Sequence, residues 1–160
     1  MSKPLTGIKI AILAANGFDQ TQFTAAQRAL MNAGATLKVV SPDQGLVNGW
    51  EGNAWGHHFA VDQGLSTALG VDYDMLVVPG GPCSMDKLKT TAHTKRFLNS
   101  FMTSMKPVVM FEDAVSLLEF AGQNVDVSVH GNMAVLPGAD DISAMIDFMN
   151  AQISSVQKAA

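Results

Sequence analysis

The 160-residue sequence contains one cysteine, Cys83, and no long apolar run. A single cysteine excludes an intrachain disulfide and any metal site built from several cysteines. No apolar stretch approaches the roughly 20 residues that a membrane-spanning helix requires, and the first residues lack the apolar region of a signal peptide. We therefore expect a soluble cytoplasmic protein with no membrane partner.

Basic residues are few and scattered. Ten lysines and arginines stand against 14 acidic residues, which gives a formal net charge of -4 and a sequence pI near 5.4. Without a local basic patch, nucleic acid is not an expected partner. Repeats, linkers and low-complexity segments are also lacking. Because 48% of the residues are hydrophobic, we expect a single domain over 1–160 with one substantial core, frayed at 154–160.

Apolar runs alternate with helical stripes along the chain. Continuously apolar runs predict parallel strands buried on both faces, and the strand-helix-strand order at the start implies a right-handed crossover. Two segments with alternating residues and turn signals predict hairpins instead. The elements expected are strands at 8–14, 36–41, 75–78 and 108–111, helices at 19–33, 65–69, 91–105, 114–121 and 141–153, and hairpins at 45–62 and 125–136.

The strand at 108–111 passes into the helix at 114–121 across only two residues, Glu112 and Asp113. Ligands bind at the carboxyl ends of strands in doubly wound sheets, and a sharp strand-to-helix turn presents a nucleophile in such folds. Here the presented residue is an acid, with Asp113 placed to cap the helix. Alternatively, Glu112 only complements the helix N-terminus, an effect of roughly 0.3–1 kcal/mol.

Two further stretches carry polar or flexible groups. Gly80 and Gly81 follow the strand at 75–78, and their backbone N–H groups either hold an anion or oxyanion or simply allow a turn. The hairpin at 45–62 contains both tryptophans and the pair His57-His58, which line a pocket or cover a sheet edge. Adjacent histidines on a strand point to opposite faces and do not easily share one metal ion. We expect no metal and no cofactor.

These motifs resemble the DJ-1/PfpI superfamily, and most closely its PfpI-like intracellular protease branch. The matching residues are Ala-Asn-Gly-Phe-Asp at 15–19, the excursion at 45–62, Asp-Tyr-Asp-Met-Leu-Val-Val-Pro-Gly-Gly at 72–81 and Lys-Pro-Val at 106–108. The resemblance covers nearly the whole chain. It implies a flavodoxin-like α/β three-layer sandwich, with a mostly parallel central sheet and helices on both faces, and assembly as a homodimer or higher oligomer.

The resemblance also implies a catalytic pattern that this chain breaks. Active members carry Ala-Ile-Cys-His-Gly at the strand-to-helix turn, where Glu112 stands in place of the cysteine and Asp113 in place of the histidine. The family's acid from the first loop matches Asp19. Cys83 lies after Pro-Gly-Gly and does not match the nucleophile. A carboxylate cannot form the thioester or hemithioacetal that a thiolate forms, so protease or glyoxalase activity by that route should be absent.

Two functions remain open at this stage. The first is a non-catalytic module that oligomerises or binds a small molecule, as the similarity of residues 7–42 to the C-terminal domain of large-subunit catalases suggests. The second is a hydrolase, amidase or glyoxalase-like enzyme in which Asp19 and Glu112 act as general acid and base and share a proton. Activity through Cys83, or flavin binding by analogy with flavodoxin, is less favoured. The ligand contacts expected are Gly80, Gly81, Pro82 and Cys83.

Overall fold

A six-stranded sheet forms the centre of the computed structural model, which describes residues 5–42, 45–51, 54–122, 132–136 and 142–159. The strand order is β6-β3-β1-β7-β8-β9, and every neighbouring pair is parallel. This confirms the predicted parallel sheet. Its strands are β1 (Lys9–Leu13), β3 (Thr36–Ser41), β6 (Gln63–Gly64), β7 (Met75–Val78), β8 (Val108–Phe111) and β9 (Met133–Leu136).

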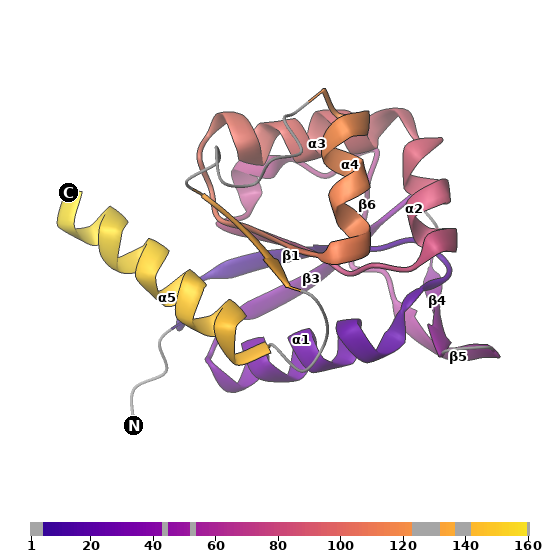
Figure 1. The fold of residues 1–160 in the computed structure, drawn as a ribbon, viewed down its shortest axis with the longest axis horizontal. Helices are drawn as coiled ribbons and strands as arrows, with labels where there is room; N and C mark the ends of the chain where they lie inside the picture. Colours follow the sequence, from indigo (N-terminus) through magenta and orange to yellow (C-terminus); the bar gives the residue numbers. More distant parts are fainter. Residues whose placement is uncertain (1–4, 43–44, 52–53, 123–131, 137–141, 160) are drawn as a thin grey trace.

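Helices cover both faces of the sheet (Figure 1), as the sequence predicts. Helices α1 (Gln20–Asn32) and α5 (Ile142–Ala159) lie on one face. Helices α2 (Pro82–Lys89), α3 (Ala92–Thr103) and α4 (Ser116–Phe120) lie on the other. Successive strand residues point to opposite faces, so each buried strand contributes to two cores and must be apolar throughout.

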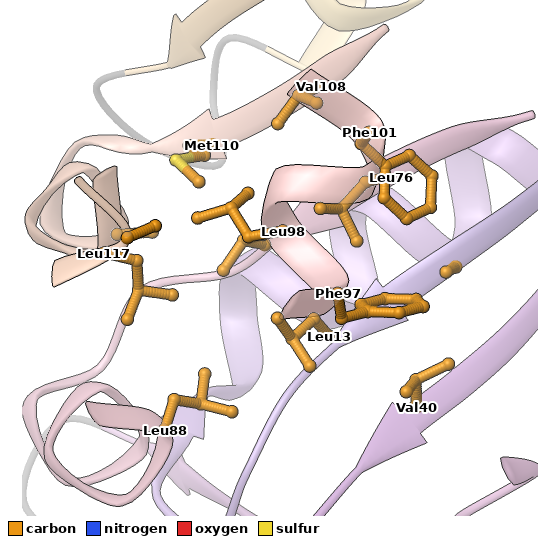
Figure 2. Close-up of a cluster of buried hydrophobic side chains, with 14 of the residues drawn as sticks. Leu13, Val40, Leu76, Leu88, Phe97, Leu98, Phe101, Val108, Met110 and Leu117 are labelled. Atoms are coloured by element: carbon orange, nitrogen blue, oxygen red, sulfur yellow. The ribbon is translucent and has the colours of Figure 1, made fainter. Parts of the chain in front are cut away.

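Strand β1 shows this division. Ile10 and Ile12 belong to the core under α1 and α5, whereas Ala11 and Leu13 belong to the core under α2, α3 and α4. In Figure 2 the second core gathers leucines from both layers: Leu88, Leu98 and Leu117 come from the helices, and Leu13 and Leu76 come from the strands. Burying one such side chain contributes about 1.5–3 kcal/mol.

A second, three-stranded sheet holds the predicted hairpin at 45–62. Strands β4 (Leu46–Glu51) and β5 (Ala54–Ala60) are antiparallel, and β2 (Phe18–Asp19) pairs with β4 in parallel. The ring of Phe59 packs on Phe18 and Phe23 with centroids 5.6 and 4.7 Å apart, which fastens the hairpin to α1. Strand β5 forms one edge of this sheet, and Trp55 on it is 55% exposed.

The prediction of a helix at 65–69 is wrong. These residues form a turn, and a 3-10 helix, η1, follows at Gly70–Asp72. The guanidinium of Arg96 on α3 donates to the carbonyl oxygens of Leu65 and Ala68 at 3.1 and 2.9 Å. The backbone N–H of Ala68 donates to the carbonyl oxygen of Gly64 at 3.1 Å, so one helix-like turn forms here, and the guanidinium of Arg96 holds its carbonyls instead of a continued helix.

Helix α2 was not predicted, and it places Cys83, which follows Pro-Gly-Gly, in the first turn of a helix. Pro82 stands at the start of α2, where proline is favoured because its missing N–H has no partner to lose. Buried Met85 and Leu88 sit three residues apart on its inner face. The proline and this spacing are signals that the sequence did contain.

The expected helix at 114–121 is divided in two. A 3-10 helix, η2, spans Glu112–Val115, and α4 begins at Ser116. Asp113 therefore lies inside η2, and the residue that precedes η2 is Phe111. The prediction that Asp113 caps this helix is wrong, because the helical turn begins immediately after β8 and leaves no extended residue between them.

Some predictions fall outside the described residues. The first strand of the hairpin predicted at 125–136 and the first residue of the helix predicted at 141–153 are among them, whereas β9 of that hairpin pairs in parallel with β8. The backbone of α5 is helical as far as Ala159, past Ser154, where fraying was expected. None of the described helices combines the length and the apolar character needed to cross a membrane.

Candidate functional site

Glu112 lies at the carboxyl end of β8. The strand ends at buried Phe111, and Glu112 is the first residue of η2 and is exposed to solvent. The turn packs against α2 and β9. A carboxylate is thus presented at the position where parallel sheets place their ligands.

Asp19 lies at the end of β2 and begins α1. Its carboxylate Oδ1 accepts a hydrogen bond from the backbone N–H of Gln22 at 3.0 Å, which is the standard capping interaction of a helix N-terminus. The backbone N–H of Asp19 donates to the carbonyl oxygen of Gly80 at 2.8 Å. Asp19 therefore joins the loop after β1 to the loop after β7, and both loops end at the same edge of the sheet.

The predicted anion cradle at Gly80 already has an internal partner. Its backbone N–H donates to the side-chain Oε1 of Gln22 at 2.7 Å. Gly81 adopts φ 117°, and a Cβ there would lie 2.5 Å from the carbonyl oxygen of Gly17. Glycine is required at position 81 because two loop backbones touch there, and the amide of Gly80 holds a side chain of the protein itself.

Cys83 and Ser84 fix the start of α2 against the loop after β1. Cys83 is exposed, and a Cβ added at Gly17 would lie 2.3 Å from the Cys83 Cβ. The buried hydroxyl of Ser84 accepts a hydrogen bond from the backbone N–H of Ala15 at 3.0 Å. The backbone of the loop after β1 therefore lies against one side of Cys83, which is exposed on its other side. The side chain of Pro82 is not among those that the structure describes.

Of the predicted site residues, the structure places Asp19, Gly80 and Gly81 in direct contact. Among the residues that the structure describes, no hydrogen bond joins the carboxylates of Asp19 and Glu112. Gln22 was missed by sequence reasoning. It stands three residues after the helix cap, where the capping-box pattern places a glutamate or glutamine, so the spacing of Asp19 and Gln22 was the available signal.

The family model of the DJ-1/PfpI family matches residues 8–144 of the chain. The chain belongs to the DJ-1/PfpI family. One relative is general stress protein 18 of Bacillus subtilis, 33% identical over 103 residues, which are 64% of this chain and 58% of that protein. Another is catalase HPII of Mycobacterium avium, 30% identical over 114 residues, which are 71% of this chain and 16% of the catalase. The chain thus spans less than two thirds of either relative.

Solved structures of DJ-1/PfpI proteins share the fold. A ThiJ/PfpI domain protein from Brachyspira murdochii superposes with a TM-score of 0.74, covering 94% of this chain and 98% of that one at 16% identity. Oxidised DJ-1 of Toxoplasma gondii gives a TM-score of 0.72, covering 94% and 91% at 16% identity. At this identity the likeness shows the flavodoxin-like α/β fold alone.

In this DJ-1/PfpI chain a buried glutamine fastens the hairpin beside the site. Gln20 is 5% exposed; its Nε2 donates to Glu51 Oε1 at 2.7 Å, and its Oε1 accepts from the backbone N–H of His57 at 2.6 Å. A Cβ at Gly49 or Gly56 would collide with the Gln20 side chain, at 2.7 and 2.0 Å from its Oε1. The two glycines make room for this anchor, which sequence reasoning also missed.

The histidines of the hairpin are exposed on β5. In the described part of the chain, no three His, Cys, Asp or Glu side chains come together in a way that could hold a metal ion.

Proposed function

We propose that this chain is a non-catalytic DJ-1/PfpI module that binds a small molecule at the carboxyl edge of its sheet and self-associates. The observation that supports this most is the placement of the acid and the thiol. Glu112 takes the first position after β8, while Cys83, the only cysteine, lies in α2 after β7. An exposed carboxylate at the turn does not supply the thiolate nucleophile on which acyl transfer or hemithioacetal chemistry relies.

The hydrogen bonds around the turn also favour binding over catalysis. An oxyanion site needs preorganised donors aimed at the developing charge, but the N–H of Gly80 already donates to Gln22. The carboxylate of Asp19 is engaged as the cap of α1. We infer that a ligand at this edge would present N–H or O–H donors to Glu112 and to the second oxygen of Asp19.

Self-association is supported by the second sheet. An edge strand exposes unpaired backbone groups and readily pairs with another chain. On this sheet β5 is such an edge, and Trp55 and Leu46 are 55% and 54% exposed. We propose that a second copy of this chain covers this hairpin. With one exposed free cysteine and a net charge of -4, we also propose a reducing cytoplasmic setting without nucleic-acid or membrane partners.

A turnover screen tests the absence of catalysis. Wild type, Glu112→Gln and Cys83→Ser would be assayed against peptide, amide and 2-oxoaldehyde substrates. We expect no turnover above the uncatalysed rate by any of the three. If wild type shows turnover that is lost in Glu112→Gln and retained in Cys83→Ser, the chain is an enzyme that uses the carboxylate. If the turnover is lost in Cys83→Ser, the chain uses thiol chemistry.

A further inference from the structure

A pocket of about 330 Å³ lies at the amino edge of the sheet, opposite the edge that carries Glu112. It is formed where β1 and β3 begin and where the chain enters β6 and β7. Nothing in the proposed function involves it. Its lining consists of charged and polar residues: Lys9, Thr36, Lys38, Asp62, Gln63, Asp72 and Tyr73.

The register of the sheet places two lysines on one face of this pocket. Lys9 pairs with Thr36, and Ala11 pairs with Lys38. Residues two apart on a strand share a face, as do paired residues on neighbouring strands, so both lysines lie on the face of Ala11. Ala11 is buried in the core under α2, α3 and α4, whereas Lys9 and Lys38 are exposed. The lysines therefore stand where the helical cover of that face ends.

Charges of both signs surround the pocket without neutralising one another. Lys9 and Lys38 supply two ammonium groups, and Asp62 and Asp72 supply two carboxylates. Within the described residues, none of these four side chains forms an ion pair. One oxygen of Asp62 accepts from the backbone N–H of Val39 at 2.7 Å, which fixes that carboxylate in place and leaves its other oxygen available.

Tyr73 and Gln63 form a fixed polar wall. Tyr73 is 4% exposed, its hydroxyl donates to Gln63 Oε1, and Gln63 Nε2 donates to the carbonyl oxygen of Thr67 at 3.4 Å. Burial, and after it the charges of Asp72 and Asp62, raise the pKa of Tyr73 above its ordinary value. The phenol consequently stays neutral and keeps this bond, so the wall is formed before any ligand arrives.

We propose that this pocket binds a small zwitterion of the free amino-acid class. Its carboxylate lies between Lys9 and Lys38, and its ammonium faces Asp72 and the free oxygen of Asp62. A simple anion would be attracted by the two lysines but repelled by both aspartates. A simple cation would be attracted by the aspartates but repelled by the lysines. Only a ligand with both charges satisfies both pairs. The volume is at the small end of ligand pockets, which fits a single amino acid better than a nucleotide.

A ligand titration of the full chain tests the proposal, followed by nitrogen-15 NMR at the backbone amides of Thr36 and Tyr73. The probes are norvaline and its isomer 5-aminovalerate, which carry both charges at different separations, with valerate and butylamine as controls that each carry one. We expect at least one zwitterion to give saturable shifts at millimolar concentration. Valerate and butylamine should bind about tenfold more weakly or worse, the equivalent of one lost charged contact.

Variants locate the two charge contacts. Lys38→Met and Asp72→Asn should each weaken binding of the zwitterion about tenfold. Lys95→Met, which removes an exposed lysine of α3 that does not line the pocket, should leave affinity unchanged. Equal binding of valerate, unchanged affinity in both pocket variants, or the absence of saturable shifts with both zwitterions would overturn the proposal. The proposed function at Glu112 would be untouched by such a result.

Discussion

Replacing Gln20 by alanine should weaken the attachment of the hairpin to α1, which the contacts of Phe59 with Phe18 and Phe23 also hold. The side chain of Gln20 joins α1 to both strands of the hairpin, through the carboxylate of Glu51 on β4 and the backbone N–H of His57 on β5. Gln20→Ala removes both hydrogen bonds and leaves a space under the two glycines that made room for it.

The expected cost follows from these two bonds. A hydrogen bond between neutral groups contributes about 0.5–1.5 kcal/mol, and one to a charged group about 1.5–3 kcal/mol. Glu51 is exposed, so water compensates its carboxylate in part and the lower half of that range applies. The loss should be about 2–4 kcal/mol in the free energy of unfolding. For a chain of this length that lowers the melting temperature by roughly 4–15 °C.

Urea melts followed by circular dichroism and by tryptophan fluorescence would measure this loss. Both tryptophans lie in the hairpin, with ring centroids 5.1 Å apart, so tryptophan fluorescence reports changes in the hairpin directly. Gln27→Ala is the matched control, because Gln27 lies on α1 and, among the residues that the structure describes, makes no hydrogen bond to a strand. A double-mutant cycle with Glu51→Ala isolates the charged bond. If Gln20→Ala and Gln27→Ala agree within about 0.5 kcal/mol, the anchor has no energetic role.

Three further predictions concern the site, the core and assembly. Gly81→Ala should lower the free energy of unfolding by about 3 kcal/mol or more, because the added Cβ would strike the backbone of the neighbouring loop. The control Gly7→Ala, at a position with positive φ but open space, should lower it by about 1–2 kcal/mol. Equal losses for the two variants in chemical denaturation would contradict this. Because the native state raises the pKa of Tyr73 above 10.0 by burial and then by two aspartates, stability should be full below about pH 10 and fall as pH rises through the raised value. Tyr73→Phe should remove that fall in alkaline melts, and an unchanged pH profile would argue against it. Light scattering at micromolar concentration should give a mass above the 16.9 kDa of one chain, and Trp55→Glu should shift it towards monomer; a monomeric wild type would exclude self-association under these conditions.

The sequence predicts the central sheet well because burial on both faces leaves a strong pattern. Every residue of β7 and β8 is buried, so a continuous apolar run was the only composition these strands could have. The ends of α1 and α3 were predicted to within about two residues for a related reason. Each has an apolar stripe ended by a small or polar residue, and that signal is local.

The site was predictable in position but not in its hydrogen bonds. Parallel topology brings Asp19 and Gly80 to one edge of the sheet, but the capture of the Gly80 amide by Gln22 depends on how two loops pack. Similarly, Gln20 is polar and lies in a helix, and only the folded hairpin shows that it is buried. The prediction of a helix at 65–69 was wrong because of another long-range contact, in which the guanidinium of Arg96 on α3 donates to the carbonyl oxygens of Leu65 and Ala68.

Consumption of methylglyoxal by the purified protein tests most directly the proposal that this chain is non-catalytic, with Glu112 at the turn supplying no thiolate. Wild type should consume none above the uncatalysed rate and carry no adduct at residue 112 in intact-protein mass spectra. Glu112→Cys is the positive control for the adduct, because it places a thiol at the turn. Consumption by wild type that persists in Cys83→Ser would contradict the account, since the turn would then catalyse without any thiol.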